Sequence, residues 1–225
     1  MARSVQARLA PAVDEGLSLA DRAYYAIREL IVSLELPPGS AVREPELTAE
    51  LGIGRTPVRE ALRRLAQERL VEVFPRRGIF VTTVDVRDLA RLCEVRLVLE
   101  PEAARLAAER AIQTDLDELS HLLSLLGPAR RRDDRALIEL DQRIHRAVYR
   151  ASHNEFLSET LETYYAHAQR IWMLALARTD LGAAVDEHAG LLEAILRGNG
   201  ERAAELMRRH VETFEGEMRD VLLAS

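Results

Sequence analysis

The stretch LGIGRTPVREALRRL (residues 51–65) sets four arginines on one short segment of a chain whose formal net charge is −6. Apolar residues recur in it with the i, i+3, i+4, i+7 spacing of one helix face, at Val58, Ala61, Leu62 and Leu65. The opposite face of the helical wheel carries Thr56, Arg59, Glu60 and Arg63, and Arg55 opens the helix. The stretch therefore predicts an amphipathic helix with a polar, basic outer face.

Two further helices are expected before this one. SLAD (18–21) is a capping box that starts a helix at Ser18, and LPPGS (36–40) ends that helix because proline cannot continue it. EPEL (44–47) starts a second, short helix, which GIG (52–54) breaks. A helix, a tight glycine-containing turn and a second helix with a basic outer face are the pattern of a helix-turn-helix.

The stretch LVEVFPRRGIFVTTV (70–84) predicts a β-hairpin with PRRG (75–78) as its turn. Apolar residues alternate along both arms as they do in strands, at Val71, Val73, Ile79 and Val81. A hairpin that follows a helix-turn-helix is a wing. We therefore expect Arg76 and Arg77, at its tip, to reach the backbone or the minor groove of a DNA duplex.

The arginines of the third helix suit recognition of duplex DNA. The second helix of a helix-turn-helix enters the major groove with its N-terminal residues at the base edges, where arginine pairs with guanine through two parallel bonds. Thr56 and the helix N-terminus can hold a phosphate. A basic amphipathic helix alone is more often a solvated surface, but the ordered set of helices, glycine turn and Arg-tipped hairpin favours DNA binding.

Composition and charge separate this front region from the rest of the chain. Residues 1–84 carry 12 Arg and 11 acids, whereas the remainder carries 19 Arg and 26 acids. This asymmetry predicts a flexible arm at 1–16, a DNA-binding domain at 17–84 and a second domain at 85–225. The chain has one cysteine, no secretory signal and no apolar run of about 20 residues, so we expect a cytoplasmic protein that does not enter a membrane.

From Asp85 onward the sequence shows helical periodicity and no strand pattern. The segment 85–111 predicts a helix that Pro101 kinks or restarts, and further helices are expected at 114–126, 133–151, 155–178, 181–197 and 200–222. The run RRR (130–132) is expected to be a solvated loop. The fold class is therefore mainly α: an N-terminal winged helix-turn-helix of three helices plus a β-hairpin, followed by an all-α bundle of about six helices.

Four side chains that commonly ligate metals fall on inward stripes of this bundle. Asp141 and His145 are four residues apart on one helix face, and His188 and His210 lie among apolar residues of later helices. A lone histidine on an apolar face is usually an ordinary core residue, but burying three of them beside an aspartate without partners costs roughly several kcal/mol. A divalent metal removes that cost. We therefore predict a metal site, with Zn²⁺ as the first expectation and Ni²⁺ or Mn²⁺ left open.

The front region resembles the winged helix-turn-helix of the GntR family of bacterial transcription regulators over about residues 18–83, above all in GRTPVREALRRL and RRGIFV. The resemblance implies that operator DNA is contacted by Arg55, Thr56, Arg59, Arg77 and Gly78. One difference is Gly54, where many relatives have Ser or Thr, so one phosphate contact is missing here.

The body resembles the effector-binding FCD domain of the FadR-type subgroup over about residues 86–222, as in ELDQRIHRAVYRASHN (139–154) and DEHAGLLEAILRGN (186–199). Metal-binding members of that subgroup use an Asp and a His on one helix and two later His, which match Asp141, His145, His188 and His210. Arg96 matches an arginine that faces a bound carboxylate in several members; a surface or core-edge role for it is equally open.

The expected function is that of a homodimeric transcription regulator, in this family more commonly a repressor, whose two recognition helices about 34 Å apart read an inverted repeat. A small carboxylate metabolite would bind the metal and meet Arg96, and its binding would change operator affinity. One alternative is a metal-dependent hydrolase fused to a DNA-binding domain, although no inward general base is evident near the four ligands. Another is a regulator whose metal is purely structural.

Overall fold

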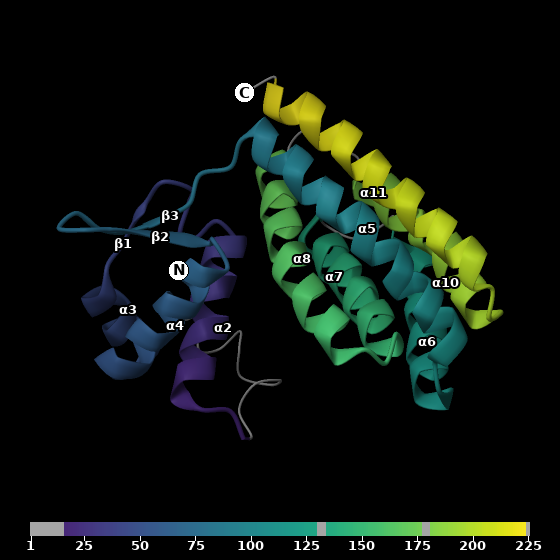
Figure 1. The fold of residues 1–225 in the computed structure, drawn as a ribbon, viewed down its shortest axis with the longest axis horizontal. Helices are drawn as coiled ribbons and strands as arrows, with labels where there is room; N and C mark the ends of the chain where they lie inside the picture. The colour runs from purple at the N-terminus through teal and green to yellow at the C-terminus, as the bar shows by residue number, and fades with distance from the viewer. Residues whose placement is uncertain (1–15, 130–133, 177–180, 224–225) are drawn as a thin grey trace. The chain divides into compact units, whose positions relative to one another are not determined.

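The computed structural model describes residues 16–129, 134–176 and 181–223. Apart from Gly16, the expected N-terminal arm lies outside the described residues, and so does the arginine run 130–132. The chain divides between Val84 and Asp85 into two compact units (Figure 1).

The first unit contains the expected helix-turn-helix. Its helices are α2 (Leu19–Val32), α3 (Glu44–Leu51) and α4 (Arg55–Gln67). The Ser18 hydroxyl accepts the Asp21 backbone N–H at 3.1 Å and so caps α2. Gly52 ends α3 with φ +64°, a left-handed conformation that residues with a side chain rarely adopt. The apolar stripe of α4 is buried and α4 packs against α2, which leaves the basic stripe of α4 outward.

The wing is part of a three-stranded sheet, and the prediction of a bare hairpin was incomplete. Strand β2 (Val71–Phe74) pairs antiparallel with β3 (Gly78–Val81), and β1 (Ala41–Val42) pairs with the other edge of β3, in the order β1-β3-β2. A two-residue strand is too short to show an alternating pattern. It forms because the free edge of β3 offers unpaired backbone groups, which Ala41–Val42 meets.

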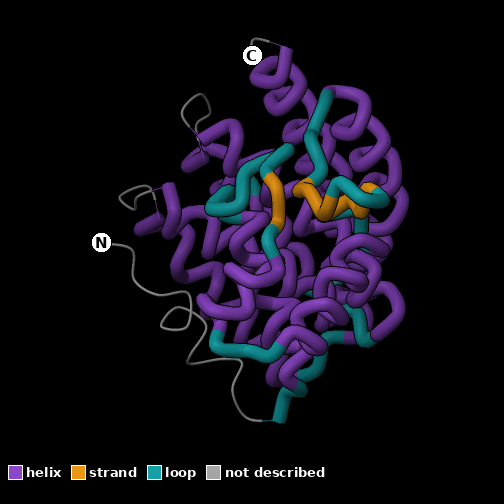
Figure 2. The backbone as a smooth tube through the Cα atoms, turned by 90° about the vertical axis from the view of Figure 1, so that its left-hand side faces the viewer, coloured by secondary structure: helices purple, strands orange, loops and turns teal. Residues whose placement is uncertain are grey.

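The described residues of the second unit form helices joined by short turns and contain no strand, and Figure 2 shows helices dominating the backbone outside the small sheet. Its helices are α5 (Val86–Arg110), α6 (Gln113–Ala129), α7 (Asp134–Ala151), α8 (Glu155–Ala175), α9 (Leu181–Asp186), α10 (His188–Leu196) and α11 (Gly200–Leu223). Helices α5 and α11 lie side by side and antiparallel (Figure 1), and α7 and α8 pack against α5.

Pro101 lies inside α5, which runs unbroken from Val86 to Arg110, so of the two expected effects of this proline a restart of the helix does not occur. Two other expectations about this bundle were wrong in detail. Helix α6 continues to Ala129 instead of ending at residue 126. The single helix expected at 181–197 is two helices that meet at Glu187, so the described part of the bundle contains seven helices and His188 begins one of them.

None of the described helices is long and apolar enough to span a lipid bilayer.

Candidate nucleic-acid interface and metal centre

The outer face of α4 is exposed and basic. Four of the residues expected to meet DNA lie on it, each exposed to solvent: Arg55, Thr56, Arg59 and Arg63. Gly54 caps the helix without a side-chain hydrogen bond. The N–H groups of the first turn therefore have no capping side chain, and with the helix dipole they form a natural site for a phosphate.

Two arginines of α4 have different surroundings. Arg59 donates from Nε to Glu44 Oε2 on α3 at 2.7 Å, and 64% of the Arg59 side chain is exposed. Arg64 instead donates to Asp21 on α2 at 2.6 Å, and its guanidinium lies 4.1 Å from the centre of the Tyr24 ring. Arg64 therefore fastens α4 to α2, whereas Arg59 stays on the outer face and can exchange an exposed partner for DNA.

The remaining predicted DNA contacts, Arg76, Arg77 and Gly78, are exposed at the turn between β2 and β3. The Arg77 backbone N–H donates to the Phe74 carbonyl at 3.1 Å, which closes the turn. Gly78 has φ +107°, and a Cβ built there would touch nothing, so glycine is required by the backbone conformation and not by lack of space. The turn therefore fixes where the two arginines leave the sheet.

In the second unit the structure brings together the four predicted metal ligands. Asp141 and His145 lie on α7, His188 begins α10 and His210 lies on α11; one ligand atom of each lies within 4.8 Å of the others, and all four residues are buried. The Nε2 atom of His145 is 3.2 Å from Nε2 of His188 and 3.3 Å from Nε2 of His210. The Oδ1 atom of Asp141 is 3.6 Å from Nε2 of His188.

Each of the three imidazoles has an oxygen atom beside its other nitrogen. Nδ1 of His188 lies 3.1 Å from the Val185 carbonyl, and Nδ1 of His210 lies 3.2 Å from Glu187 Oε2. Nδ1 of His145 lies 3.3 Å from a Glu100 carboxylate oxygen. A proton on each Nδ1 lies on the side of these oxygens and leaves three Nε2 lone pairs facing one another and a carboxylate.

This donor set fits a divalent cation. Lone pairs that converge without a proton between them repel one another, and a cation removes that repulsion. Imidazole nitrogens and a carboxylate suit Zn²⁺, Ni²⁺ and Mn²⁺. A tetrahedral ion with bonds of about 2.0–2.1 Å holds its ligand atoms about 3.3 Å apart, which agrees with the 3.2 and 3.3 Å from Nε2 of His145 to Nε2 of His188 and of His210.

The charge states of two ligands agree with this assignment. Burial and, next, the neighbouring His210 lower the pKa of His188 to about 3, so the imidazole is neutral at neutral pH. Burial acts to raise the pKa of Asp141, but the nearby histidines pull it below its ordinary value, so the carboxylate is ionised. Neutral imidazole and ionised carboxylate are the forms that bind metals.

Glu100 is the functional candidate that sequence reasoning missed. Glu100 is fully buried on α5 and forms an ion pair with the equally buried Arg96 one turn before it. Burial acts to raise the pKa of Glu100, but the Arg96 charge and the contact with His145 hold that pKa well below its usual range. The carboxylate is thus held ionised beside Nδ1 of His145, not as a base open to substrate; its Oε2 atom, 3.3 Å from that nitrogen, makes no hydrogen bond to the described residues.

The spacing of residues along the helices could have revealed some of the side chains that surround the four predicted ligands. Glu100 follows Arg96 by four residues, and Tyr149 follows His145 by four, with its hydroxyl 3.1 Å from Nδ1 of that histidine. The Tyr165 hydroxyl on α8 donates to Asp141, and no local pattern links those two residues.

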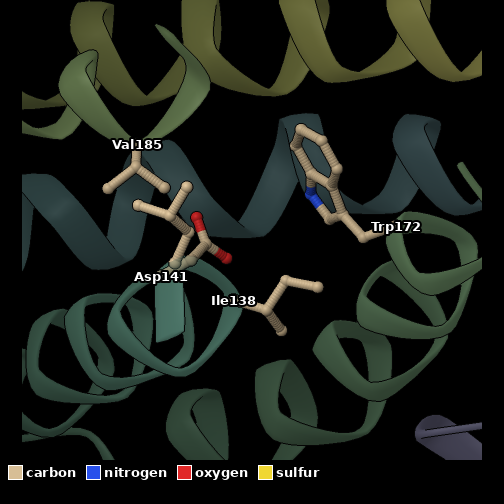
Figure 3. A pocket seen from close by; sticks show the side chains of 5 residues that line it. Ile138, Asp141, Trp172 and Val185 are labelled. Carbon is tan, nitrogen blue, oxygen red and sulfur yellow. The ribbon is translucent and has the colours of Figure 1, made fainter. Parts of the chain in front are cut away.

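Arg96, the predicted effector contact, is 1% exposed. Its guanidinium lies 4.7 Å from the centre of the Phe214 ring, and its Nη1 atom has no hydrogen-bond partner among the described residues. Arg96 does not line the small hollow that opens beside Asp141 (Figure 3). The walls of that hollow are Leu137, Ile138, Asp141, Trp172 and Val185.

A winged helix-turn-helix with an exposed basic face, joined to a helical domain that brings four potential metal ligands together, is the architecture of a DNA-binding transcription regulator. Comparison with known proteins agrees. Residues 19–81 match the model of the bacterial regulatory proteins of the gntR family, and residues 91–213 match the FCD domain. The chain belongs to the GntR family of transcription regulators, in the group that carries an FCD domain.

Three similar proteins illustrate the relationship. A transcriptional regulator in an unstable DNA locus of Streptomyces ambofaciens is 35% identical over 197 residues, which cover 84% of this chain and 80% of that protein. The galactonate operon transcriptional repressor of Escherichia coli is 30% identical over 213 residues, covering 84% and 92%. The solved structure of E. coli McbR/YncC has a TM-score of 0.81 at 24% identity and covers 91% and 98%, which shows the shared fold.

Proposed function

We propose that this regulator is a homodimeric repressor that binds operator DNA and releases it when a small carboxylate binds beside a metal in the FCD domain. Several relatives are named as repressors, among them the galactonate operon repressor, which supports the direction of control. The single observation that carries the sensing half is the convergence of three imidazole nitrogens and one carboxylate in the buried centre of the second unit.

In the proposed DNA-binding function, each predicted contact residue of α4 and of the wing has a role. Arg55, Arg59 and Arg63 would meet base edges and phosphates in the major groove, and Thr56 would bind a phosphate beside the open helix N-terminus. The wing residues Arg76, Arg77 and Gly78 would follow the backbone into the adjacent groove. Their exposure on one helix face and one turn supports this assignment.

In the proposed sensing function, the metal is bound by Asp141, His145, His188 and His210. Zn²⁺ is the first candidate, and Ni²⁺ and Mn²⁺ are the others. A divalent cation there supplies the positive charge to which an effector carboxylate binds. Arg96 is proposed as a second contact for that carboxylate, because its Nη1 atom is a buried donor without a partner among the described residues.

A dimer follows from the way helix-turn-helix proteins read DNA. One recognition helix covers only a half-site, and two related by a twofold axis about 34 Å apart read an inverted repeat with useful affinity. Sedimentation should therefore give about twice the chain mass of 25.3 kDa.

The test begins with the DNA, selected from a random-sequence pool by the Zn²⁺-loaded protein. An inverted repeat should emerge, and fluorescence anisotropy should then measure its affinity with and without a panel of small carboxylates. The proposal expects at least one carboxylate to weaken operator binding by the loaded protein and to leave chelator-treated protein unaffected. If both forms respond equally, the metal does not take part in sensing.

The number of ligands favours a second candidate, a metal that is purely structural. Four protein ligands are the number used by closed structural zinc sites, so an effector would have to bind as an additional ligand. Circular dichroism after chelation separates the two functions. Loss of helix and of the thermal transition indicates a structural ion, whereas an intact fold that no longer responds to carboxylates supports a sensing ion.

A further inference from the structure

Helix α4 carries one acidic residue on the face that is expected to meet DNA. Glu60 follows Thr56 by four residues and precedes Arg63 by three, so these three side chains share the outward stripe of the helix. All three residues are exposed to solvent. The proposed DNA contacts include Thr56 and Arg63 but give no role to Glu60.

The basic side chains nearest to Glu60 along the helix are paired with other acids. Helix α4 packs against both α2 and α3 (Figure 1), and Arg59 donates to Glu44 on α3 at 2.7 Å. Arg64 lies four residues after Glu60, the favoured spacing for a helix ion pair, yet it donates to Asp21 on α2 at 2.6 Å. Within the described part of the chain, the Glu60 carboxylate has no hydrogen-bond or ion-pair partner. The structure therefore gives Glu60 no part in holding α4 in place.

An unpaired carboxylate on this face opposes DNA binding unless the duplex offers it a hydrogen-bond donor. Duplex DNA carries one negative charge per about 1.7 Å of its axis, so the carboxylate is repelled by every sequence alike. The donors in the major groove are the amino groups of adenine N6 and cytosine N4. Adenine also presents the acceptor N7, which repels the second carboxylate oxygen, whereas cytosine presents its donor alone. A carboxylate at this place therefore favours cytosine.

The position of Glu60 along α4 suits contact with a base edge. A recognition helix presents its N-terminal part to the bases, and Glu60 lies in the first half of α4 (Arg55–Gln67). Residues three apart are separated by about 4.5 Å along a helix axis, and neighbouring base pairs by about 3.4 Å. Glu60 and Arg63 can thus reach base pairs one or two steps apart. Because arginine pairs with guanine, the selected cytosine should lie close to a guanine in the half-site.

We propose that Glu60 is a specificity-determining residue, whose carboxylate accepts a hydrogen bond from the N4 amino group of one cytosine in each operator half-site. This inference rests on the proposed binding of operator DNA through α4 and adds the base that one residue selects. At a site with another base in that position, the carboxylate stays unpaired among phosphates, so the residue discriminates mainly by weakening the wrong complexes.

The test measures the preference for each base at every position of the half-site. The unaltered Zn²⁺-loaded chain first selects its operator from a random-sequence pool. Fluorescence anisotropy then gives the dissociation constants of duplexes in which each base pair is replaced in turn by the other three. At one position the unaltered protein should prefer cytosine by roughly five- to 150-fold, the range of a single mismatched base pair. Glu60→Ala should lose the preference at that position alone.

Glu60→Gln keeps the shape of the side chain and replaces one acceptor by a donor. Glutamine pairs with N6 and N7 of adenine through two bonds, so the preference at this position should move from cytosine toward adenine. Glu50→Gln is the matched control, because Glu50 is exposed on α3 and loses the same charge. It should change the affinity for all duplexes by a similar factor and leave every base preference as it was.

The outcomes are distinct. If Glu60→Ala binds every duplex more tightly by the same factor and keeps all base preferences, Glu60 is a solvated acid and the inference is overturned. An unchanged preference for cytosine in Glu60→Gln overturns it too. If the unaltered chain selects no operator from the pool, the proposed DNA-binding function itself fails. Circular dichroism should show both variants melting like the unaltered chain, since Glu60 is exposed, and Glu60→Gln decides the matter if Glu60→Ala does not fold.

Discussion

Replacing Glu100 by Gln should weaken metal binding although Glu100 is not among the four proposed ligands. The carboxylate lies 3.3 Å from Nδ1 of His145 and is held ionised by Arg96. Glutamine has nearly the same shape but carries one donor and one acceptor. If its amide N–H₂ faces His145, Nδ1 loses the negative charge beside it, and the tautomer with a free Nε2 is less favoured. If the amide is reversed, its N–H₂ meets the Arg96 donor instead.

The size of the effect follows from the contacts that are lost. Removing an outer-shell partner of a metal-bound histidine lowers metal affinity by about 10- to 100-fold, which corresponds to about 1.4–2.7 kcal/mol. The same change leaves the buried Arg96 without a compensating charge. Loss of one partner of a buried ion pair costs up to about 3–5 kcal/mol of folding stability, so the fold of the metal-free variant must be measured in parallel.

The assay is competition for Zn²⁺ between the protein and a chromophoric chelator, at a temperature where circular dichroism shows each variant folded. Glu102→Gln is the matched control, because Glu102 lies two residues further along α5, is half exposed and pairs with Arg105 at 2.6 Å. It should leave the metal affinity unchanged. Tyr149→Phe removes the hydroxyl that lies 3.1 Å from Nδ1 of His145 and keeps the ionised carboxylate of Glu100, so its effect should be smaller than that of Glu100→Gln.

A folded Glu100→Gln protein that binds Zn²⁺ as tightly as the unaltered chain would refute the reasoning. It would mean that the orientation of His145 is set by packing alone and that the buried Arg96–Glu100 pair has no part in the metal centre.

Three further changes test the remaining assignments. Arg59→Ala should weaken operator binding by about 1–3 kcal/mol in an anisotropy titration, with the fold intact. Arg64→Ala should mainly lower the thermal midpoint of unfolding, because the Arg64 guanidinium bonds to another helix. If both variants lost the same affinity at unchanged stability, the different roles assigned to the two arginines would be contradicted. Glu44→Gln frees Arg59 from its exposed partner and should tighten operator binding by up to about fivefold, and weaker binding would instead assign Glu44 an orienting role. His188→Ala should abolish stoichiometric zinc in elemental analysis while the exposed His121→Ala retains it, and full occupancy in the first variant would show that the ligand set is wrong.

The helices and the buried face of each could be predicted from the sequence, because each of these elements has its own periodicity of apolar residues. The spacing of Val58, Ala61, Leu62 and Leu65 identifies the buried face of α4, and the structure confirms that face and the mainly helical fold. The Asp141–His145 pair could be placed on one face by the same arithmetic, since residues four apart share a helix face. Strand β1 could not, because two residues carry no period and the strand exists only through its partner β3.

Contacts between different helices could not be predicted, because the spacing of residues within one helix does not record which other helix packs against it. The sequence shows that Glu100 follows Arg96 by four residues. It does not show that α5 turns Glu100 toward His145, which lies forty-five positions further along the chain. Likewise Arg64 resembles the other arginines of α4 in sequence and differs only because α2 lies beside it.

The sequence by itself determined the order and type of the elements, the basic face of the third helix and the inward position of each histidine on its own helix, because backbone hydrogen bonding repeats at short range. Only the tertiary structure decided that three imidazoles on three helices point their Nε2 atoms at one another, that a buried ion pair stands behind one of them, and that a small hollow opens beside the aspartate. Those features arise where helices distant in sequence are brought within contact by burial of their apolar faces, and short-range spacing carries no record of which faces meet.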